Sequence, residues 1–532
     1  MPQYDAIVIG AGHNGLTCAC YLARAGLKVL VLEQYHTIGG MTISEEITEP
    51  GFLSDIHASG YLLGKLSPAP DELDLAAHGL DPITPEPNWA HVTTDGRLVT
   101  ISRDPKKSFQ SLEQFSTADA QAWQALYDRY LAAKPQIVAG MHSVPPVPAQ
   151  QFATLWQQPD GPDEYRFEVQ SARSWATQTF STEAARAYFA SFALHGALSP
   201  DDAGGGQYAW LMFTSVQDVG VSIVRGGMHS VSRALARSLE AHGGEIRTNA
   251  LVKEIVVRDG KAVAVRLDGG ETIDVDQVIA SNVDPRHLAL DLLGEAAVGP
   301  AVADKIRHYE WGDSFFTIYA ALDRPPEYKT GPAASQAGYV HGAGASMEDL
   351  SRIFTECRSG LVPAGPMLGM VNESVVDPSR APAGKGLMKF VAHYVPYHIT
   401  GDATGKMRGT GWDEIREQYA DYLIDYITAN YIPNLKESLI KRVAESPLDL
   451  ERRIISAVQG THQHGAFLPY QTGAMRPIAE MGQYRSPVAN VYLCGAGSHP
   501  GGGVGMGPGR NAAQAIYTNL GLDFAATLRR PA

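Results

Sequence analysis

The first thirty or so residues have the order of elements that is typical of a dinucleotide-binding βαβ unit. Residues 5–9 are an apolar run that predicts a short buried strand, and Thr17–Ala25 predicts a helix that Gly26 ends. A second apolar run, Leu27–Leu32, predicts a parallel strand, and Glu33 follows it directly. Strand, glycine-rich turn, helix, strand and acidic residue together predict an α/β domain of the Rossmann type.

Three glycines between the first strand and the helix have separate geometric roles. Gly10 permits a tight turn, Gly12 lets the backbone approach a pyrophosphate, and Gly15 lets the helix pack closely on the strand. The helix N-terminus offers free N–H groups to phosphate, and Glu33 stands where a carboxylate accepts from a ribose hydroxyl. The predicted cofactor-binding residues of this segment are Gly10, Ala11, Gly12, His13, Asn14, Gly15 and Glu33.

A glycine pair, Gly39-Gly40, follows Glu33 closely and precedes Met41. Because no Cβ projects from such a pair, the loop can lie flat against a large ligand, although an ordinary left-handed turn would use the same residues. The spacing resembles the extended fingerprint of FAD oxidoreductases of the amine oxidase and phytoene desaturase kind.

A second glycine-rich segment lies near the C-terminus. Val491–Cys494 predicts a buried strand that runs into Gly495–Gly509, and a helix is predicted to start near Met506–Asn511. So much glycine is costly in conformational entropy, and it is expected where backbone touches a flat ligand. The N-terminus of the following helix would stabilise negative charge on a reduced flavin.

The residues 495–501, Gly-Ala-Gly-Ser-His-Pro-Gly, resemble a motif of carotenoid desaturases, with Ser498 in place of Thr and Met506-Gly507 where members often have Pro-Gly. With the N-terminal fingerprint, the chain resembles the phytoene desaturase superfamily of FAD oxidoreductases, which is related to the amine oxidases. Gly-His-Asn-Gly and the terminal Pro-Gly-Arg-Asn most resemble the carotenoid ketolase branch. That branch includes animal pyridine nucleotide-disulphide oxidoreductase domain-containing proteins.

The resemblance implies FAD, and we expect it to be bound non-covalently because no His or Cys lies in a recognised linkage context. It assigns the adenine edge to Val252 and the pyrophosphate and flavin to the two glycine-rich segments. We see no second complete nucleotide fingerprint, so oxygen, a quinone or another acceptor is expected to reoxidise the flavin. The further residues that the resemblance assigns to the cofactor are Gly39, Gly40, Met41, Val252, Gly495, Ala496, Val504, Gly505 and Met506.

Glycine-rich segments typical of nucleotide-binding domains occur again near residues 223 and 491, which predicts two discontinuous domains. Residues 1–105, 216–290 and 481–532 are expected to form the FAD-binding domain. Residues 106–215 and 291–480 are expected to form an inserted α+β substrate domain.

Two local predictions concern the region around residue 100. His91–Thr94 and Leu98–Ile101, around Asp95-Gly96, predict a β-hairpin within or beside the nucleotide domain. Ala118–Ala133 has helical spacing, and the proline-rich stretch Gln136–Pro148 is expected to be a loop or lid.

Composition excludes several classes of function. The 532 residues carry a net charge of −14 and no marked basic run, so nucleic acid is not an expected partner. The four cysteines form no C-x-x-C pair, which disfavours disulfide-reductase chemistry and suits a cytoplasmic protein. The fingerprint starts at residue 5, and no run reaches the roughly 20 apolar residues of a membrane span. Peripheral contact with a membrane stays open.

Candidate acid–base residues are histidines, because imidazole titrates in the useful range. The candidate catalytic residues are His57, His462, His464 and His499. His462 and His464 have no third ligand nearby in sequence, so no metal is expected. The aromatic side chains proposed for the wall of an apolar cavity, with plain core packing as the alternative, are Trp210, Phe213, Phe315, Phe316, Tyr319, Tyr394 and Tyr397.

The leading hypothesis is therefore an FAD-dependent oxidoreductase for an apolar, isoprenoid or carotenoid-like substrate, acting by desaturation, ketolation or isomerisation. A flavin amine oxidase is the second hypothesis, and a flavin-fold protein that acts by binding a partner is the third. The sequence does not specify the substrate or the oligomeric state.

Overall fold

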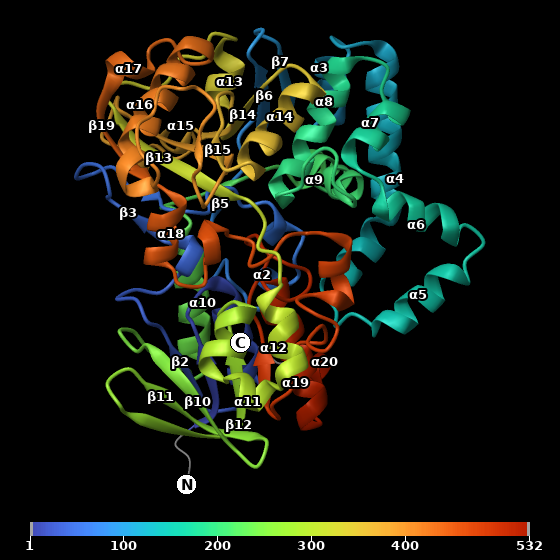
Figure 1. The fold of residues 1–532 in the computed structure, drawn as a ribbon, viewed down its shortest axis with the longest axis vertical. Coiled ribbons are helices and arrows are strands. Elements are labelled where there is room, and N and C mark those ends of the chain that lie inside the picture. Colours follow the sequence, from blue (N-terminus) through green and yellow to red (C-terminus); the bar gives the residue numbers. More distant parts are fainter. Residues whose placement is uncertain (1–3, 529–532) are drawn as a thin grey trace.

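The computed structural model describes residues 4–528, which form two seven-stranded sheets with helices around them. In Figure 1 the first sheet lies in the lower half of the molecule and the second in the upper half. The strands of the first sheet are β1 (Tyr4–Ile9), β2 (Val29–Leu32), β9 (Glu245–Arg247), β10 (Val252–Arg258), β11 (Lys261–Leu267), β12 (Thr272–Ser281) and β20 (Val491–Leu493).

The centre of the first sheet is parallel and is assembled from segments far apart in the sequence. β1 pairs with β2 and β12, β12 pairs with β20, and β2 pairs with β9. Ile9 lies opposite Ser281, and Ser281 lies opposite Leu493, so these strands end at the same level. Their loops therefore leave the sheet at one shared edge, where open α/β sheets bind ligands. The hairpin β10–β11 extends the sheet with antiparallel pairs.

The helix α1 (His13–Arg24) starts four residues before the predicted position, because Gly12 already serves as its N-cap. It packs between α10 (His229–Ala241) and α19 (Gly507–Leu520) on one face of the sheet. A Cβ atom at Gly15 would lie 2.2 Å from the carbonyl oxygen of Gly10. Only glycine therefore permits this approach of helix to strand, as predicted.

The second sheet has the order β19-β13-β17-β16-β14-β6-β7. Its strands are β6 (Trp89–Thr93), β7 (Leu98–Ile101), β13 (Ser314–Leu322), β14 (Tyr339–Ala343), β16 (Met367–Val371), β17 (Gly386–Val395) and β19 (Leu439–Glu445). The predicted hairpin near residue 100 forms, but β6 pairs in parallel with β14. The hairpin is therefore part of the second sheet, where all five β6 residues are buried. The wider division into two domains stays a prediction.

Helices cover both faces of the second sheet. The helices on one face are α3 (Pro105–Leu112), α4 (Thr117–Met141), α7 (Ala172–Thr179), α8 (Glu183–Ser191), α9 (Gly205–Val219) and α14 (Met347–Arg358). On the other face, α16 (Trp412–Asn430) packs on apolar residues of β13, β16 and β17. No helix within residues 4–528 is long and apolar enough to cross a membrane.

The remaining helices are short or peripheral. They are α2 (Ala69–Glu72), α5 (Pro148–Trp156), α6 (Gly161–Val169), α11 (Glu295–Val298), α12 (Pro300–Arg307), α13 (Pro332–Gln336), α15 (Glu373–Val376), α17 (Leu435–Ser438), α18 (Pro447–Arg453) and α20 (Phe524–Leu528).

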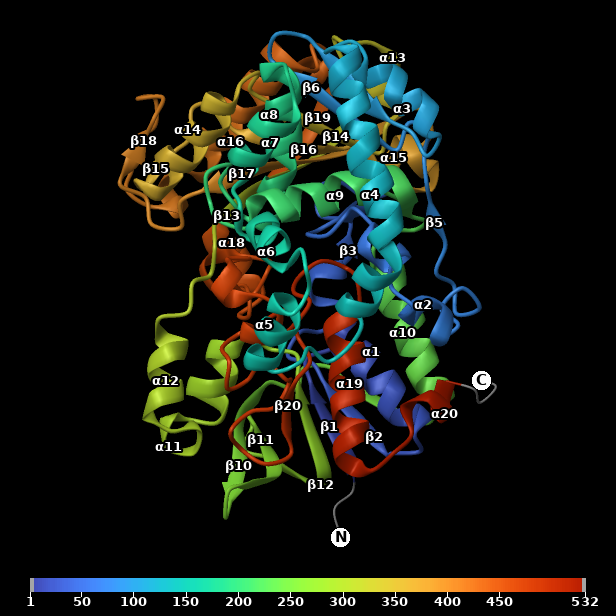
Figure 2. The same cartoon turned by 90° about the vertical axis from the view of Figure 1, so that its right-hand side faces the viewer.

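The long helix α4 joins the two halves of the molecule. Figure 2 shows it descending from the second sheet towards α19. There the Asn511 amide donates to the carbonyl oxygen of Met141 at 3.0 Å. The predicted loop over Gln136–Pro148 was therefore wrong as far as Met141, because Pro135 is accommodated inside the helix.

A buried ionic cluster also connects the two halves. Nη1 of Arg380 lies 3.0 Å from Oδ2 of Asp55, and its Nη2 lies 3.2 Å from Oε1 of Glu373. Oδ1 of Asp55 accepts from the backbone N–H of Met228, at the start of α10, at 2.7 Å. All three charged side chains are fully buried. Removing one charge from such a cluster leaves the others without compensation.

We predict that Arg380→Met lowers the free energy of unfolding by about 3–5 kcal/mol, because Asp55 and Glu373 would stay buried and unpaired. Urea unfolding followed by intrinsic fluorescence measures the change. Arg324→Met is the matched control: Arg324 pairs with Glu437 on the surface, and its loss is expected to cost less than about 1 kcal/mol. Equal effects of the two substitutions would contradict the prediction.

Candidate functional site

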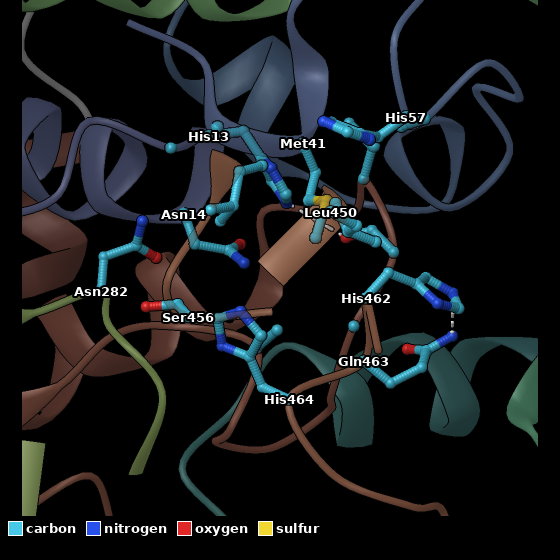
Figure 3. Close-up of a pocket in the computed structure, with 18 of the residues that line it drawn as sticks. His13, Asn14, Met41, His57, Asn282, Leu450, Ser456, His462, Gln463 and His464 are labelled. Atoms are coloured by element: carbon cyan, nitrogen blue, oxygen red, sulfur yellow. Dashed lines mark hydrogen bonds between the residues drawn. The ribbon is translucent and has the colours of Figure 1, made fainter. Parts of the chain in front are cut away.

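A cavity of about 920 Å³ lies where the first sheet ends and the second begins. It is lined by the N-terminal fingerprint, by the C-terminal glycine-rich loop and by side chains from β6, β13, β14 and β17. Figure 3 shows His13, Asn14, Met41 and His57 opposite a segment that carries His462 and His464. The two sheets therefore build one site together.

Glu33 lies at one end of this cavity with its carboxylate bound to backbone. Oε2 accepts from the N–H of Ala11 at 2.7 Å, and Oε1 accepts from the N–H of Tyr35 at 2.9 Å. Burial raises the pKa of Glu33, and the two backbone donors oppose that shift. These bonds hold the carboxylate in place beside Gly10 and Gly12, and each oxygen keeps a further lone pair for a ligand.

The C-terminal loop reaches the same place through its backbone. Gly502, Gly503 and Val504 line the cavity, and the carbonyl oxygen of Gly503 lies 3.1 Å from Nε2 of His13. Met506 is the N-cap of α19 and has a φ of 61°. This left-handed conformation is uncommon for a residue other than glycine, and such strain persists where the surroundings impose it.

Arg476, which is fully buried, holds the loop of His462 and His464 against the C-terminal loop. Its guanidinium donates to the carbonyl oxygen of Ala496 at 3.0 and 3.1 Å and to that of Gln463 at 2.6 Å. These charge-assisted bonds to backbone fix the relative position of two walls of the cavity.

The structure brings most of the predicted site residues together. The predicted residues that line the cavity are Gly10, Gly12, His13, Asn14, Glu33, Gly40, Met41, His57, Val252, His462, His464, Ala496 and Val504. Those that lie outside its lining are Ala11, Gly15, Gly39, Gly495, His499, Gly505 and Met506. His499 instead lies against α4, where its Nε2 is 2.9 Å from the carbonyl oxygen of Gly140.

His57 forms a buried couple with Glu445. Its Nδ1 lies 3.4 Å from Oε1 of Glu445, while its Nε2 has no hydrogen-bond partner among residues 4–528. Burial, Arg453 and Lys389 lower the pKa of His57 well below its usual value. Burial raises the pKa of Glu445 to about 7. Near neutral pH the imidazole is therefore uncharged.

His462 and His464 lie on the wall opposite His57 (Figure 3). Nε2 of His462 accepts from the Gln463 amide at 2.7 Å. Burial lowers the pKa of His462 to about 3 and that of His464 to about 4, so both rings are neutral. In the part of the chain that the structure describes, no three His, Cys, Asp or Glu side chains are grouped to hold a metal.

Most of the aromatic residues proposed for the cavity wall instead take the alternative role of core packing. Of the seven aromatic residues proposed for it, only Phe315 lines the cavity within the described residues. Phe316, for example, faces the core on the other side of the sheet, because neighbouring residues on a strand point to opposite faces. The cavity-lining side chains that sequence reasoning missed include Trp89, His195, Tyr208, Tyr339, Lys389, His393 and Arg453. The alternation of Lys389, Val391 and His393 along one strand was the available signal that these three side chains share a face.

Comparison with known proteins now identifies the family. The family described as "Flavin containing amine oxidoreductase" matches residues 15–516. The chain belongs to this family. It is an FAD-dependent oxidoreductase of mixed α/β fold, as predicted.

Several curated relatives of this flavin oxidoreductase match along nearly their whole length. The chain is 32% identical to pyridine nucleotide-disulfide oxidoreductase domain-containing protein 2 of Rattus norvegicus, covering 98% of this chain and 94% of the relative. It is 28% identical to one of the subunits of limonene dehydrogenase from Castellaniella defragrans, covering 98% of this chain and 96% of the relative. It is 26% identical to the lycopene-forming phytoene desaturase of Pseudescherichia vulneris, covering 94% of this chain and 95% of the relative. The resemblance to the phytoene desaturase superfamily is confirmed.

Solved structures show the same fold at lower identity. An oxidoreductase from Methanosarcina mazei superposes with a TM-score of 0.62 at 17% identity, covering 96% of this chain and 99% of that one. Cyclohexylamine oxidase from Brevibacterium oxydans superposes with a TM-score of 0.57 at 15% identity, covering 98% of this chain and 100% of that one.

The cavity fits FAD by its own geometry. Gly12 lines it at the N-terminus of α1, where a Cβ atom would lie 2.7 Å from Nδ2 of Asn282. The buried Oδ1 of Asn14 has no partner among residues 4–528, and Glu33 offers a held carboxylate. A volume of about 920 Å³ is at the upper end for ligand pockets, which suits a cofactor together with a small substrate.

We predict that Glu445→Gln changes how stability depends on pH. Because the pKa of Glu445 is raised to about 7 in the folded state, that state binds more protons than the unfolded chain above about pH 4.5. The stability that protonated Glu445 contributes is therefore lost as the pH rises towards 7. Glutamine cannot ionise, so the variant should gain about 2–3 kcal/mol relative to the native protein between about pH 5 and 8. Urea unfolding at four pH values in this range tests it, and a constant difference would contradict it.

Proposed function

We propose that this flavin oxidoreductase dehydrogenates a small apolar substrate of the isoprenoid class at a C–H bond. The observation that carries the proposal is the character of the cavity beside the second sheet. Its apolar lining side chains there include Leu62, Leu63, Met212, Val221, Phe315, Val371 and Val391. Among the described residues that line the cavity, only Glu33 and Asp291 are acidic, and both lie beside the first sheet.

Two relatives support this substrate class by their names. Limonene and phytoene, which name two proteins that match this chain over at least 94% of its length, are isoprenoid hydrocarbons. Such molecules carry no charge and need an apolar chamber rather than a counter-ion. The lining around Phe315 and Val391 meets that need.

We infer that FAD occupies the part of the cavity beside the first sheet, held without a covalent bond. Glu33 would accept from the ribose, the backbone of Gly10–Gly15 and the N-terminus of α1 would face the pyrophosphate, and Val252 would face the adenine. Met41 and the backbone around Ala496 and Val504 would then lie along the flavin ring.

Bound FAD supplies a two-electron acceptor for a hydride from a substrate carbon. Forming a C=C bond also requires a proton to leave the neighbouring carbon. We assign that proton to Nε2 of His57, which is uncharged and unpartnered among residues 4–528 and belongs to a ring that lines the cavity. Oxygen or a quinone would then take the two electrons.

An amine oxidase is the second candidate, favoured by the fold it shares with cyclohexylamine oxidase. Two observations weigh against it. The ammonium form of an amine would meet Lys389 and Arg453 rather than a carboxylate in the part of the cavity beside the second sheet. The rings of Trp89 and Tyr339 also stack on each other, with centroids 4.8 Å apart and an interplanar angle of 5°, so no cation fits between them.

We predict that Glu33→Ala weakens FAD binding by about 1–3 kcal/mol, because ribose hydroxyls would lose their acceptor. Titration of the flavin-free protein with FAD, followed by flavin fluorescence, measures the affinity. Glu254→Ala is the control, since Glu254 pairs with Arg266 on the surface of the same sheet. An unchanged affinity of Glu33→Ala for FAD would contradict the assigned contact between Glu33 and the ribose. Flavin that stays in the pellet after acid precipitation would contradict non-covalent binding.

Anaerobic reduction of the bound flavin tests the substrate class. We predict that apolar isoprenoids bleach the flavin absorbance, whereas primary amines do not. A panel of limonene, a carotenoid precursor, cyclohexylamine and putrescine separates the two candidate functions. Rapid bleaching by the amines alone would reject the proposed substrate class and favour the amine oxidase.

A further inference from the structure

A group of polar side chains lies at the end of the cavity that the second sheet forms. His393 comes from β17, Tyr339 from β14, and His195 from the short helical turn between α8 and α9. All three line the cavity. The rings of His195 and His393 are nearly perpendicular, at 78°, with centroids 5.6 Å apart. We call these three residues the polar end of the chamber.

Three of the four ring nitrogen atoms of the polar end have no hydrogen-bond partner among the described residues. His393 is only 5% exposed, and neither of its ring nitrogens bonds to any atom within residues 4–528. Nε2 of His195 is buried and equally unpartnered in this part of the chain. A buried polar atom without a hydrogen bond costs about 1–3 kcal/mol. A pure hydrocarbon in the chamber would leave all three nitrogens in that state.

The backbone also directs His393 towards the chamber. Phe315 pairs with His393, whereas Ser314 pairs with Val395, so Tyr394 is an extra residue in β17. Tyr394 has a φ of 65°, a left-handed conformation that costs free energy in a tyrosine. Such a bulge re-aims the neighbouring side chains and is common next to active sites.

The protonation of these rings selects the kind of ligand. Burial lowers the pKa of His195 to about 4 and that of His393 well below its usual value, so both imidazoles are neutral at pH 7. Each therefore offers one N–H donor and one acceptor nitrogen. A hydroxyl or carbonyl group matches these atoms. A carboxylate would need a cation beside it. Lys389 and Arg453 line the cavity beside the second sheet, but both are engaged near His57. Lys389 donates to the carbonyl oxygen of His57, and Arg453 pairs with Glu445.

We propose that the substrate is an isoprenoid that carries one neutral oxygen function, a hydroxyl or a carbonyl, which His393 and His195 bind at the polar end of the chamber. Tyr339, whose hydroxyl lies with Nε2 of His393 beside Gly369, completes this binding site. Gly369 is required there, because a Cβ atom would lie 2.4 Å from that hydroxyl. The proposal rests on the proposed function, and it narrows the substrate from a hydrocarbon to an oxygenated terpenoid.

Four probes that share one skeleton test the inference on the FAD-loaded protein. They are p-menthane, menthol, menthone and p-menthane-3-carboxylate, and isothermal titration calorimetry gives each dissociation constant. We expect menthol and menthone to bind at least tenfold more tightly than p-menthane, and the carboxylate to bind no more tightly than p-menthane. His393→Phe should remove the preference for the oxygenated probes and leave p-menthane within threefold.

Two further variants separate recognition from folding. His393→Asn keeps a donor and an acceptor, so it should retain part of the preference. His91→Phe is the matched control: His91 is buried on β6, packs on Tyr188 and does not line the cavity, so the preference should not change. Flavin content and thermal unfolding check that each variant is folded. The comparison of probes on the native protein decides the question even where a variant does not fold.

The outcomes distinguish the inference from the function on which it rests. Equal affinity for p-menthane and menthol would overturn the inference and leave the proposed function standing. Tightest binding of the carboxylate would also overturn it. If none of the four probes binds and only amines bleach the flavin, both the inference and the proposed function are wrong.

Discussion

The parallel pairing of β1, β12 and β20 is the constraint on which the rest of the site depends. The ladder continues one residue past the strands: Asn282 donates its N–H to Ile9, and Cys494 donates its N–H to Ser281, both at 2.8 Å. Three loops therefore start side by side, although their residues are more than 200 positions apart in the sequence. A slip of one residue in this register would turn every side chain of a strand to the other face of the sheet.

The second sheet supplies what the first cannot, which is a wall for a substrate. Its position is held by buried polar contacts rather than by a single apolar seam. Arg380 lies between Asp55 and Glu373, and Arg476 joins the backbone of Gln463 to that of Ala496 in the C-terminal loop. Both guanidinium groups are fully buried, and a buried cation persists only where its partners are fixed. The shape of the chamber is therefore coupled to the folding of the whole molecule.

Local pattern predicted the first sheet well and the second sheet poorly. The fingerprint and the strand before Gly495 both form, because their geometry depends on neighbouring residues. The hairpin near residue 100 also forms, but its membership of the second sheet depends on β14, about 250 residues away. Sequence periodicity predicts that a strand has two different faces, but it does not predict which strand will pair with it.

The same limit applies to the site. The cofactor segment could be predicted because glycine and acidic residues follow each other at fixed spacing. The contact between His195 and His393 could not, because it depends on the long-range packing of β17 against the helical turn after α8. Phe315 was identified correctly, but its neighbour Phe316 faces the opposite core, which composition alone does not distinguish.

A crystal structure of the protein with its own cofactor is the most direct test of the central claim, that two sheets build one cavity for cofactor and substrate. We expect FAD density that starts between Glu33 and Val252 and ends with the flavin ring beside Met41 and Val504. Free space should remain between that ring and His393. Flavin density that fills the space beside His393, or that lies outside the cavity, would contradict the account.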